Sequence, residues 1–319
     1  MIVRNHLNFP DDIVLNVRMI DHRLQTLRVL HQQGTVTGTA HALHLTPSTV
    51  SAQLRQLARE LDVELLRPEG RNVLLTPAAL TLLEHADLLF AQAERARADL
   101  AAHRRGEAGR LRIVSVPSAL HGIVAPAGAE LVRENPTLAI EMSEEQSDAS
   151  FDQLLSGQAD IAVVIPSRES PPPDDVRFGQ HRLQDDLLDI LVPADHRFAT
   201  RPAVRLAEAA EESWIVSPNR PDQYELLTVS CAEAGFAPRV GHRSCEFPAM
   251  SALVANGFGV ALVPRLAHIP PQHPVVRVPL EGEPVPSRRV NACTRRGSEH
   301  QRFVALGLSV LRRWASMVI

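Results

Sequence analysis

Apolar residues recur every three or four positions in the first part of the chain, which is the spacing of a helix with one buried face. The pattern starts at Leu24, and Gly34 interrupts it. Thr46 and Pro47 then begin another helix, because a threonine hydroxyl caps a helix and proline suits its first turn. The pattern predicts three short helices.

The third predicted helix has two different faces. Apolar residues are spaced for burial along one side at Val50, Leu54, Leu57 and Leu61. The other side carries small, polar or cationic residues, namely Ser48, Thr49, Ser51, Ala52 and Arg55. Such a face fits the major groove of DNA, where hydroxyl and guanidinium groups bond to base edges and phosphates. The alternative interpretation is a capped surface helix without a partner.

A turn and a long helix follow. The segment Pro68 to Arg71 separates two short strand patterns and predicts a hairpin. Arg67 and Arg71 would contact the DNA backbone or minor groove there, or remain solvated. From Pro77 to about Arg105 there is no glycine or further proline, and a heptad-like stripe recurs at Ala79, Leu82, Ala86, Leu89, Ala93, Ala96 and Leu100. A helix on the order of 40 Å long needs cover from a partner chain, so we expect a homodimer or homotetramer.

Strand-like and helix-like segments alternate after Gly109, which predicts an α/β fold. Strands are expected at 111–116, 138–142, 161–165, 187–192, 214–216, 239–245, 260–263, 275–280 and 290–294. Helices are expected near 123–133, 151–155, 224–234, 249–256 and 299–315. The predicted architecture is an α/β protein with a mainly helical N-terminal winged helix-turn-helix, a long linker helix and a two-lobed α/β C-terminal domain. The expected boundaries are 1–18 for an extension, 19–76 for the winged domain, 77–106 for the linker helix, 107–185 with 266–319 for the first lobe, and 186–265 for the second.

Charge is unevenly distributed along the chain. The formal net charge is -4, and every basic residue is an arginine. Between His22 and Arg59 there is no acidic residue, whereas Arg23, Arg28, Arg55 and Arg59 add four positive charges. This segment is the best candidate for contact with a polyanion.

Other features limit the possible functions. No apolar run approaches the roughly 20 residues of a membrane helix, and the N-terminal stretch carries Asn5, Asn8, Asp11 and Asp12 instead of an apolar signal core. We therefore expect a cytoplasmic protein without a membrane partner. Cys231, Cys245 and Cys293 are far apart, which predicts neither a disulfide framework nor a zinc site. His41 and His44 have no third metal ligand nearby. The common catalytic and phosphate-binding motifs are absent, so we expect neither an enzyme nor a cofactor.

The segment from Gly34 to Arg55 resembles the helix-turn-helix of LysR-type transcriptional regulators. The resemblance is carried by Thr35, Val36, Thr37, Ala40, Leu43, Thr46, Pro47, Ser48, Thr49, Val50, Ser51, Gln53, Leu54 and Arg55. It continues through the wing and linker helix into 111–118, 157–164, 193–198 and 257–264. It implies a dimer or tetramer that binds a partly palindromic double-stranded operator and holds a small-molecule effector between two lobes similar to periplasmic binding proteins.

The resemblance also implies site residues. The expected DNA-binding set is Thr35, Thr37, Thr46, Ser48, Thr49, Ser51, Ala52, Arg55, Arg67 and Arg71. Gly38, Thr39 and Ala52 depart from the commonest pattern, which leaves the operator sequence open. For the effector, Ser118 begins a helix after a strand, where it could bind a polar group or simply cap the helix. The resemblance places Gln146, Ser147, Pro166, Ser217, Phe247 and Pro248 along the same cleft.

One branch of this family senses peroxide through a cysteine pair. Cys231 matches one member of that pair, but the other position falls at about Asp222, so we expect no redox sensing. Two alternatives stay open. One is a solute-binding or enzymatic α/β protein with an incidental helical N-terminus, and the other is a regulator that needs no ligand.

Overall fold

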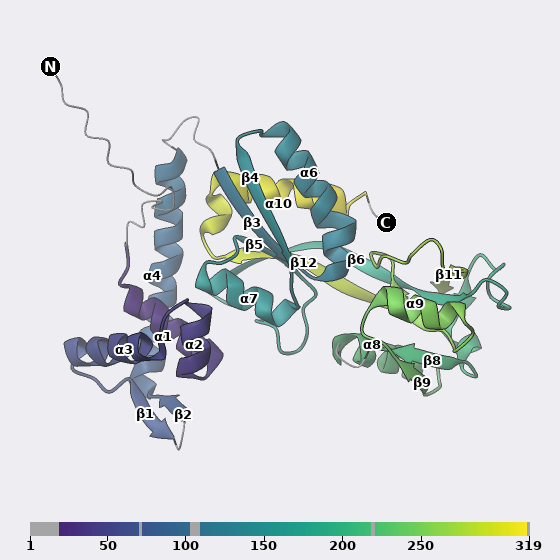
Figure 1. Cartoon of the computed structure of the whole chain (residues 1–319), viewed down its shortest axis with the longest axis horizontal. Coiled ribbons are helices and arrows are strands. Elements are labelled where there is room, and N and C mark those ends of the chain that lie inside the picture. The colour runs from purple at the N-terminus through teal and green to yellow at the C-terminus, as the bar shows by residue number, and fades with distance from the viewer. Residues whose placement is uncertain (1–18, 70–71, 103–108, 218–220, 318–319) are drawn as a thin grey trace. The chain divides into compact units, whose positions relative to one another are not determined.

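The structure, a computed structural model, describes residues 19–69, 72–102, 109–217 and 221–317 (Figure 1). It divides into two compact units between Ala93 and Glu94, inside the long helix α4 (Pro77–Ala102). The expected linker helix is therefore shared between the units. The expected extension, residues 1–18, lies outside the described residues.

The N-terminal unit is a helix-turn-helix with a β-hairpin. Its elements are α1 (His22–Gln33), α2 (Val36–Ala42), α3 (Pro47–Leu61), β1 (Leu66–Glu69) and β2 (Asn72–Leu75). Gly34 ends α1 with a φ of 66°, a left-handed conformation that glycine adopts readily. Residues from α1, α3 and α4 share one core, namely Leu24, Leu27, Leu30, Val50, Leu54, Leu57, Ala79, Leu83 and Ala86. The three predicted helices and the hairpin are confirmed.

Leu61 corrects one prediction for α3. Its spacing placed it on the buried face, but its side chain is exposed. Leu61 is the last residue of α3, and Asp62 ends the helix in a left-handed conformation. The last buried residue of α3 is Leu57, so the periodic pattern continues one turn beyond the part of the helix that is buried.

The first lobe of the sensor unit is built on parallel strands. Its elements are β3 (Gly109–Ser115), α5 (Pro117–Ala119), the π-helical turn η1 (Leu120–Val124), α6 (Ala125–Glu134), β4 (Leu138–Glu144), α7 (Ser147–Ser156), β5 (Ile161–Val164), β12 (Ser287–Arg295), the 3-10 turn η3 (Ser298–His300) and α10 (Arg302–Ala315). Strand β3 lies between β4 and β5 and is parallel to both, and β12 adds antiparallel to β5.

Helices cover both faces of this sheet. Ile113 and Ile161 face α6 and α10, whereas Val114 and Ala162 face Phe151 and its neighbours on α7. Both faces of β5 are consequently buried, which explains its continuous apolar run. This packing fixes the carboxyl ends of β3, β4 and β5 at one edge of the sheet.

The second lobe has its own pair of cores. Its elements are the long β6 (Phe178–Pro193), β7 (Val204–Arg205), the 3-10 turn η2 (Leu206–Ala209), β8 (Ser213–Val216), α8 (Pro221–Glu233), β9 (Arg239–Arg243), α9 (Phe247–Ala255), β10 (Ala261–Pro264) and β11 (Val275–Glu281). Trp214 and Leu227 lie in the core beside α8, and Ile215 and Met250 lie in the core beside α9. Strands β8 and β9 are parallel.

Strand β6 belongs to both lobes. It pairs with β12 as far as Leu187, and from Leu188 onward it pairs with β10 and β11. The sequence pattern predicted only the second half of this strand, because most residues of the first half are polar. Val278 of β11 packs in the core of the second lobe. The predicted boundaries placed β11 in the first lobe, which was expected to resume at residue 266, and this assignment is wrong.

Helical structure also starts earlier than predicted in the first lobe. It begins at Pro117 and passes through the π-helical turn η1 into α6, whereas the pattern indicated a start near Ile123. Gly122 and Pro126 interrupt the apolar spacing there, which hides the start from a periodicity search. Within the described ranges, no helix is both long enough and apolar enough to span a membrane.

Candidate DNA interface and effector site

The outer face of α3 is available for a partner. Val50, Leu54 and Leu57 are buried, which fixes the rotation of the helix, and Ser48 and Arg55 are exposed. Ser51 and Thr49 are half-buried beside them, and Ala52 is exposed. The structure thus brings the five predicted side chains of α3 onto one polar face.

Two threonines cap the helices of this motif. The Thr35 hydroxyl accepts a hydrogen bond from the Gly38 amide at 3.1 Å at the start of α2. The Thr46 hydroxyl accepts one from the Thr49 amide at 3.1 Å and lies 2.8 Å from the Ser48 hydroxyl. Thr37 is exposed on the first turn of α2. The threonine hydroxyls are therefore held by the fold before any DNA contact.

The four arginines of the basic segment have different surroundings. Arg23 is ion-paired with Asp21 and Glu60. Arg28 is buried, lies 3.6 Å from the Asp87 carboxylate and stacks over the Phe90 ring. Neither side chain is available as the expected polyanion contact, because both hold the unit together. Arg55, in contrast, is exposed and makes no ion pair or side-chain hydrogen bond with the part of the chain that is described.

The wing carries a further arginine. Arg67 on β1 is exposed and its guanidinium donates to the Glu64 carboxylate at 3.0 Å. This exposed pair is weak, so a phosphate could replace the carboxylate at small cost. Arg71, the other arginine that the sequence analysis assigned to this contact, lies outside the described residues.

Helix α4 has an apolar face without cover from its own protomer. Ala79, Ala86 and Ala93 of the predicted stripe are buried within the chain, whereas Leu89 and Leu100 are exposed. Leu80 and Leu88 are exposed as well, although the pattern did not single them out. Some residues of the heptad-like stripe thus pack inside the chain, and others, together with further leucines of α4, are exposed.

The predicted effector residue Ser118 belongs to a chain of hydrogen bonds that joins α5, β12 and β6. It is buried at the start of α5, and its hydroxyl accepts a hydrogen bond of 2.6 Å from the Arg288 guanidinium. Arg288 is in turn paired with buried Asp186 at 2.8 Å. Asp186 also accepts the Leu266 amide at 3.1 Å. Ser118 is consequently tied to β6 and β12, close to where the chain passes between lobes.

Three more predicted residues follow neighbouring strands. Gln146 and Ser147 begin α7 after β4, and Pro166 comes two residues after β5. The Ser147 hydroxyl donates to the Ile165 carbonyl at 2.9 Å and accepts the Ile165 amide at 3.1 Å. These residues therefore share the carboxyl edge of the β4-β3-β5 sheet with Ser118, as predicted for loops after parallel strands.

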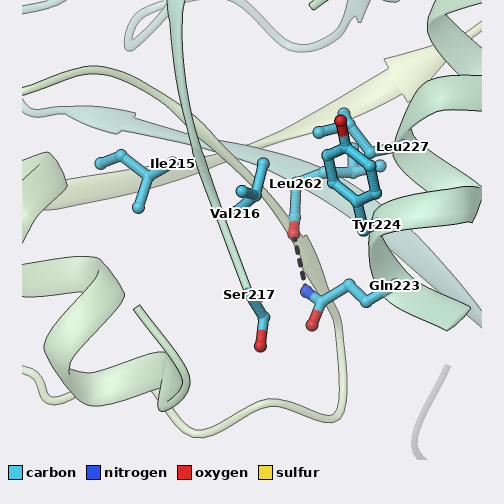
Figure 2. Close-up of a pocket in the computed structure, with 7 residues that line it drawn as sticks. All are labelled: Ile215, Val216, Ser217, Gln223, Tyr224, Leu227 and Leu262. Carbon is cyan, nitrogen blue, oxygen red and sulfur yellow. Dashed lines mark hydrogen bonds between the residues drawn. The ribbon is translucent and has the colours of Figure 1, made fainter. Parts of the chain in front are cut away.

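Ser217 lines a small pocket in the second lobe, shown in Figure 2. Its hydroxyl is buried and has no hydrogen-bond partner among the described residues. Gln223 faces the same pocket: its amide nitrogen donates to the Leu262 carbonyl at 3.3 Å, and its amide oxygen is unpartnered. Tyr224 and Leu227 complete the wall from α8. The Ser217 hydroxyl and the Gln223 amide oxygen are thus two polar atoms at one small pocket that have no partner among the described residues.

Phe247 and Pro248 have different environments at the start of α9. The Phe247 ring is buried with Met250 and Val254 in a hydrophobic core, whereas Pro248 is exposed. The expectation that Phe247 lines the cleft has no support in these contacts, because its aromatic ring packs inward.

Sequence reasoning missed two polar side chains of this region. Gln223 lies on α8 within the pocket, and Arg288 contacts Ser118 across 170 positions of the sequence. The position of Gln223, near the start of a helix after a strand, could have indicated it. Nothing in the pattern relates Arg288 to Ser118.

The cysteines and histidines suggest no redox or metal chemistry. Burial raises the pKa of Cys231 to about 12 and that of Cys293 to about 12, which keeps both thiols protonated and unreactive. His41 and His44 are exposed on or just after α2. In the described parts of the chain, no three metal-binding side chains come together.

Comparison with known sequences agrees with both halves of this description. Residues 22–80 match the family described as bacterial regulatory helix-turn-helix protein, lysR family, and residues 104–316 match the LysR substrate binding domain. The transcriptional dual regulator OxyR of Escherichia coli is 26% identical over 287 residues, covering 89% of this chain and 90% of that protein. The regulator AlsR of Bacillus subtilis is 27% identical over 230 residues, 72% of this chain and 74% of that protein.

Solved structures show the same fold. A variant of full-length OxyR from Pseudomonas aeruginosa superposes with a TM-score of 0.63 at 20% identity, covering 91% of this chain and 93% of that one. Full-length BenM gives a TM-score of 0.58 at 20% identity over 93% and 96% of the two chains. Members of this family are regulators, not enzymes. The chain belongs to the LysR family of DNA-binding transcriptional regulators, with an N-terminal helix-turn-helix and a C-terminal effector-binding domain.

Proposed function

We propose that α3 enters the major groove of an operator and that Ser48, Thr49, Ser51 and Arg55 make its contacts. The observation that carries this proposal is the division of α3 into a buried apolar face and an exposed polar face. Arg55 is the principal cation, because it has no partner within the described chain. A guanidinium so placed can reach a guanine edge or a phosphate.

The remaining DNA contacts are assigned to caps and wing. Thr35, Thr37 and Thr46 lie at the N-terminal ends of α2 and α3, where backbone amides and hydroxyls favour phosphate oxygens. Arg67, together with Arg71, would contact the backbone or the minor groove. These contacts add affinity but little sequence information.

The effector-binding part of the sensor is proposed to lie along Ser118, Gln146, Ser147, Pro166 and Ser217. Support comes from the shared carboxyl edge of β3, β4 and β5 and from the unpartnered Ser217 hydroxyl. Gln223 is added to this set because its amide oxygen faces the same pocket as Ser217. Closure of the lobes on an effector would change how the paired α3 helices meet DNA.

The protein is proposed to act in the cytoplasm as a homo-oligomer. Support comes from the exposed leucines of α4, because long helices with exposed apolar side chains pair readily. Access to chromosomal DNA requires the cytoplasmic location, and the three unpaired cysteines fit its reducing conditions.

The test is fluorescence anisotropy with the DNA upstream of the protein's own coding region, titrated with salt against a scrambled competitor. Arg55→Ala should weaken binding at least about tenfold and reduce the salt slope by about one if it contacts a phosphate. Arg133→Ala is the control, because it removes the same charge from exposed helix α6 of the sensor unit. Absence of DNA binding at low salt in the wild-type protein, or equal losses in both variants, would refute the assignment.

A separate screen addresses the effector. Thermal unfolding in the presence of a broad metabolite set should reveal at least one compound that raises the melting temperature and alters operator binding. Ser217→Ala should weaken that response. A regulator that needs no ligand would show neither effect with any compound.

A further inference from the structure

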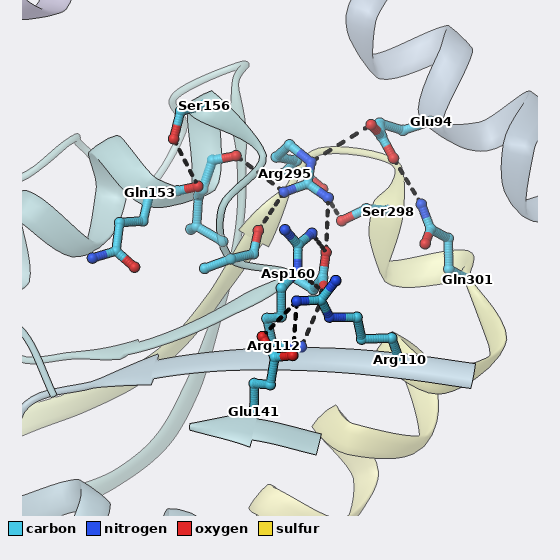
Figure 3. A network of polar contacts seen from close by, with 12 residues as sticks. Glu94, Arg110, Arg112, Glu141, Gln153, Ser156, Asp160, Arg295, Ser298 and Gln301 are labelled. Atoms are coloured by element: carbon cyan, nitrogen blue, oxygen red, sulfur yellow. Dashed lines mark hydrogen bonds and ion pairs between the residues drawn. The ribbon is translucent and has the colours of Figure 1, made fainter. Parts of the chain in front are cut away.

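Glu94 is a buried carboxylate near the end of α4, only 8% exposed. It accepts a hydrogen bond from the Arg97 guanidinium at 3.0 Å. It also accepts one from the Gln301 side-chain amide at 2.7 Å and lies 3.5 Å from the Arg295 Nε, as Figure 3 shows. A buried carboxylate is unfavourable unless it is paired. The last turns of α4 are therefore attached to the sensor unit at a specific point.

Arg295 connects this point to the end of α7. Its Nη1 donates to the Leu154 carbonyl at 3.0 Å and to the Ala159 carbonyl, and its Nη2 lies 3.3 Å from the Asp160 carboxylate. Leu154 is in the last turn of α7, and Ala159 follows the helix by a few residues. A single guanidinium thus contacts both Glu94 and the C-terminal end of α7.

Asp160 holds that guanidinium in position. Its carboxylate also accepts the Arg112 guanidinium at 2.8 Å and the Arg112 amide at 3.0 Å, as Figure 3 shows. Arg112 belongs to β3 in the centre of the parallel strands. The Arg295 guanidinium is therefore held between Asp160 and the last turn of α7, so a shift of α7 changes its contacts.

Helix α7 spans the distance from this contact to the proposed effector edge. It has ten residues, roughly 15 Å at the rise of an α-helix, and its first residue is Ser147. Phe151, Leu154 and Leu155 are buried against the sheet. A helix packed in this way moves as a body, because close-packed interiors transmit displacement instead of absorbing it.

We propose that α7 and Arg295 transmit the state of the effector site to the linker helix through Glu94. A ligand that contacts Gln146 and Ser147 displaces the N-terminal end of α7. The displacement reaches Arg295 at the other end and alters its hold on Glu94. Arg295 is a positioning residue in this scheme, and the scheme rests on the proposed effector site at the edge of β3, β4 and β5.

A double-mutant cycle tests the connection without a ligand. Hydrogen exchange of the full-length protein, followed by mass spectrometry, would compare wild type, Ser147→Ala, Glu94→Gln and the double variant. Ser147→Ala should raise exchange in residues 94–102 about threefold or more, although Ser147 does not contact them. In the Glu94→Gln variant, Ser147→Ala should cause no further rise in exchange in residues 94–102, because the connection through Glu94 is already broken.

The matched control is Glu141→Gln. Glu141 is an exposed carboxylate on β4, paired with Arg110 at 2.7 Å in the same region (Figure 3). This variant should leave exchange in both 94–102 and α7 unchanged. If Ser147→Ala fails to fold, Gln146→Ala gives the same readout from the neighbouring position.

Two results would overturn the proposal: unchanged exchange in 94–102 on perturbing the start of α7, or independent effects of the two substitutions. Failure of the effector proposal would look different. The metabolite screen would then give no hit, whereas the double-mutant cycle needs no ligand and could still be measured.

Discussion

Thr46 stabilises the start of α3 through several contacts of one hydroxyl group. It accepts the Thr49 amide and lies 2.8 Å from the hydroxyls of both Ser48 and Thr49. The same hydroxyls form part of the proposed DNA surface. Stability and recognition therefore depend on the same atoms at this position.

Replacing Thr46 by alanine should lower the stability of the N-terminal unit by about 1 kcal/mol, because the cap of α3 is lost. Both tryptophans, Trp214 and Trp314, lie in the sensor unit, so tryptophan fluorescence reports that unit alone. In urea unfolding, circular dichroism should begin to change at a lower urea concentration than in the wild type, whereas the fluorescence transition of the sensor unit should be unaltered. Thr46→Ser should restore the wild-type midpoint, and an equal loss in both variants would contradict the capping role.

The buried thiols give a second prediction at this scale. Cys231 and Cys293 should react slowly with Ellman's reagent in the native protein at pH 8, because burial raises the pKa of each thiol to about 12. Half-buried Cys245 should react first. Mass spectrometry after partial labelling identifies the modified residue, and rapid modification of Cys231 would reopen the possibility of redox sensing.

Local spacing predicts the individual residues of α3 well, because a helix relates positions only three or four apart. It identified the outward set Ser48 to Arg55 without help from the fold. It could not identify the partners of Arg23 and Arg28, since Glu60 and Asp87 lie far along the chain. The contact between Arg288 and Ser118 was hidden for the same reason.

At the scale of elements, β3 and β12 are joined by an acid, Asp160, whose protonation depends on its neighbours. Burial alone would raise the pKa of Asp160, but the hydrogen bond from Arg112 and the charges of Arg295 and Arg112 lower it below the ordinary value of 3.8. A carboxylate with a lowered pKa contributes stability at neutral pH and loses that contribution as acid protonates it.

The stability of the sensor unit should therefore contain an Asp160 contribution above pH 4 that disappears as the pH falls further. Asp160→Asn should lower the fluorescence-detected urea midpoint at pH 7. The difference between wild type and variant should shrink below the ordinary aspartate pKa of 3.8. A difference that grew on acidification would mean that the pKa of Asp160 is raised instead.

The elements themselves were largely predictable, because buried strands and amphipathic helices leave clear patterns. The exceptions have physical causes. The first half of β6 is mostly polar and pairs with β12 far along the sequence. Strand β11 pairs beside β6 in the second lobe, and only the three-dimensional pairing decides to which lobe such a strand belongs.

At the scale of the whole molecule, the leucines of α4 are the main apolar surface without internal cover. Leu88 is 61% exposed and Leu89 is 54% exposed. Within one protomer such a surface is unfavourable in water, and its burial by a second copy would recover roughly 2 kcal/mol for each leucine.

Leu88→Glu should therefore shift the protein toward monomer in sedimentation velocity and weaken operator binding, because two half-sites can no longer be bound together. Glutamate favours helix as strongly as leucine, so α4 itself should persist. Val176→Glu, an exposed position in a loop of the sensor unit, should leave the sedimentation coefficient unchanged. An unchanged oligomer in Leu88→Glu would exclude this face as the dimer contact.

Strand β6 crosses from one lobe to the other without a break and exchanges β12 for β10 and β11 at Leu187 and Leu188. Such a continuous β-strand is not equally stiff in all directions. It bends easily out of its own plane and resists stretching and in-plane shear, since those motions would break several backbone hydrogen bonds together. Bending of β6 near Leu187 and Leu188 is therefore the relative motion of the lobes that leaves most of its backbone hydrogen bonds intact.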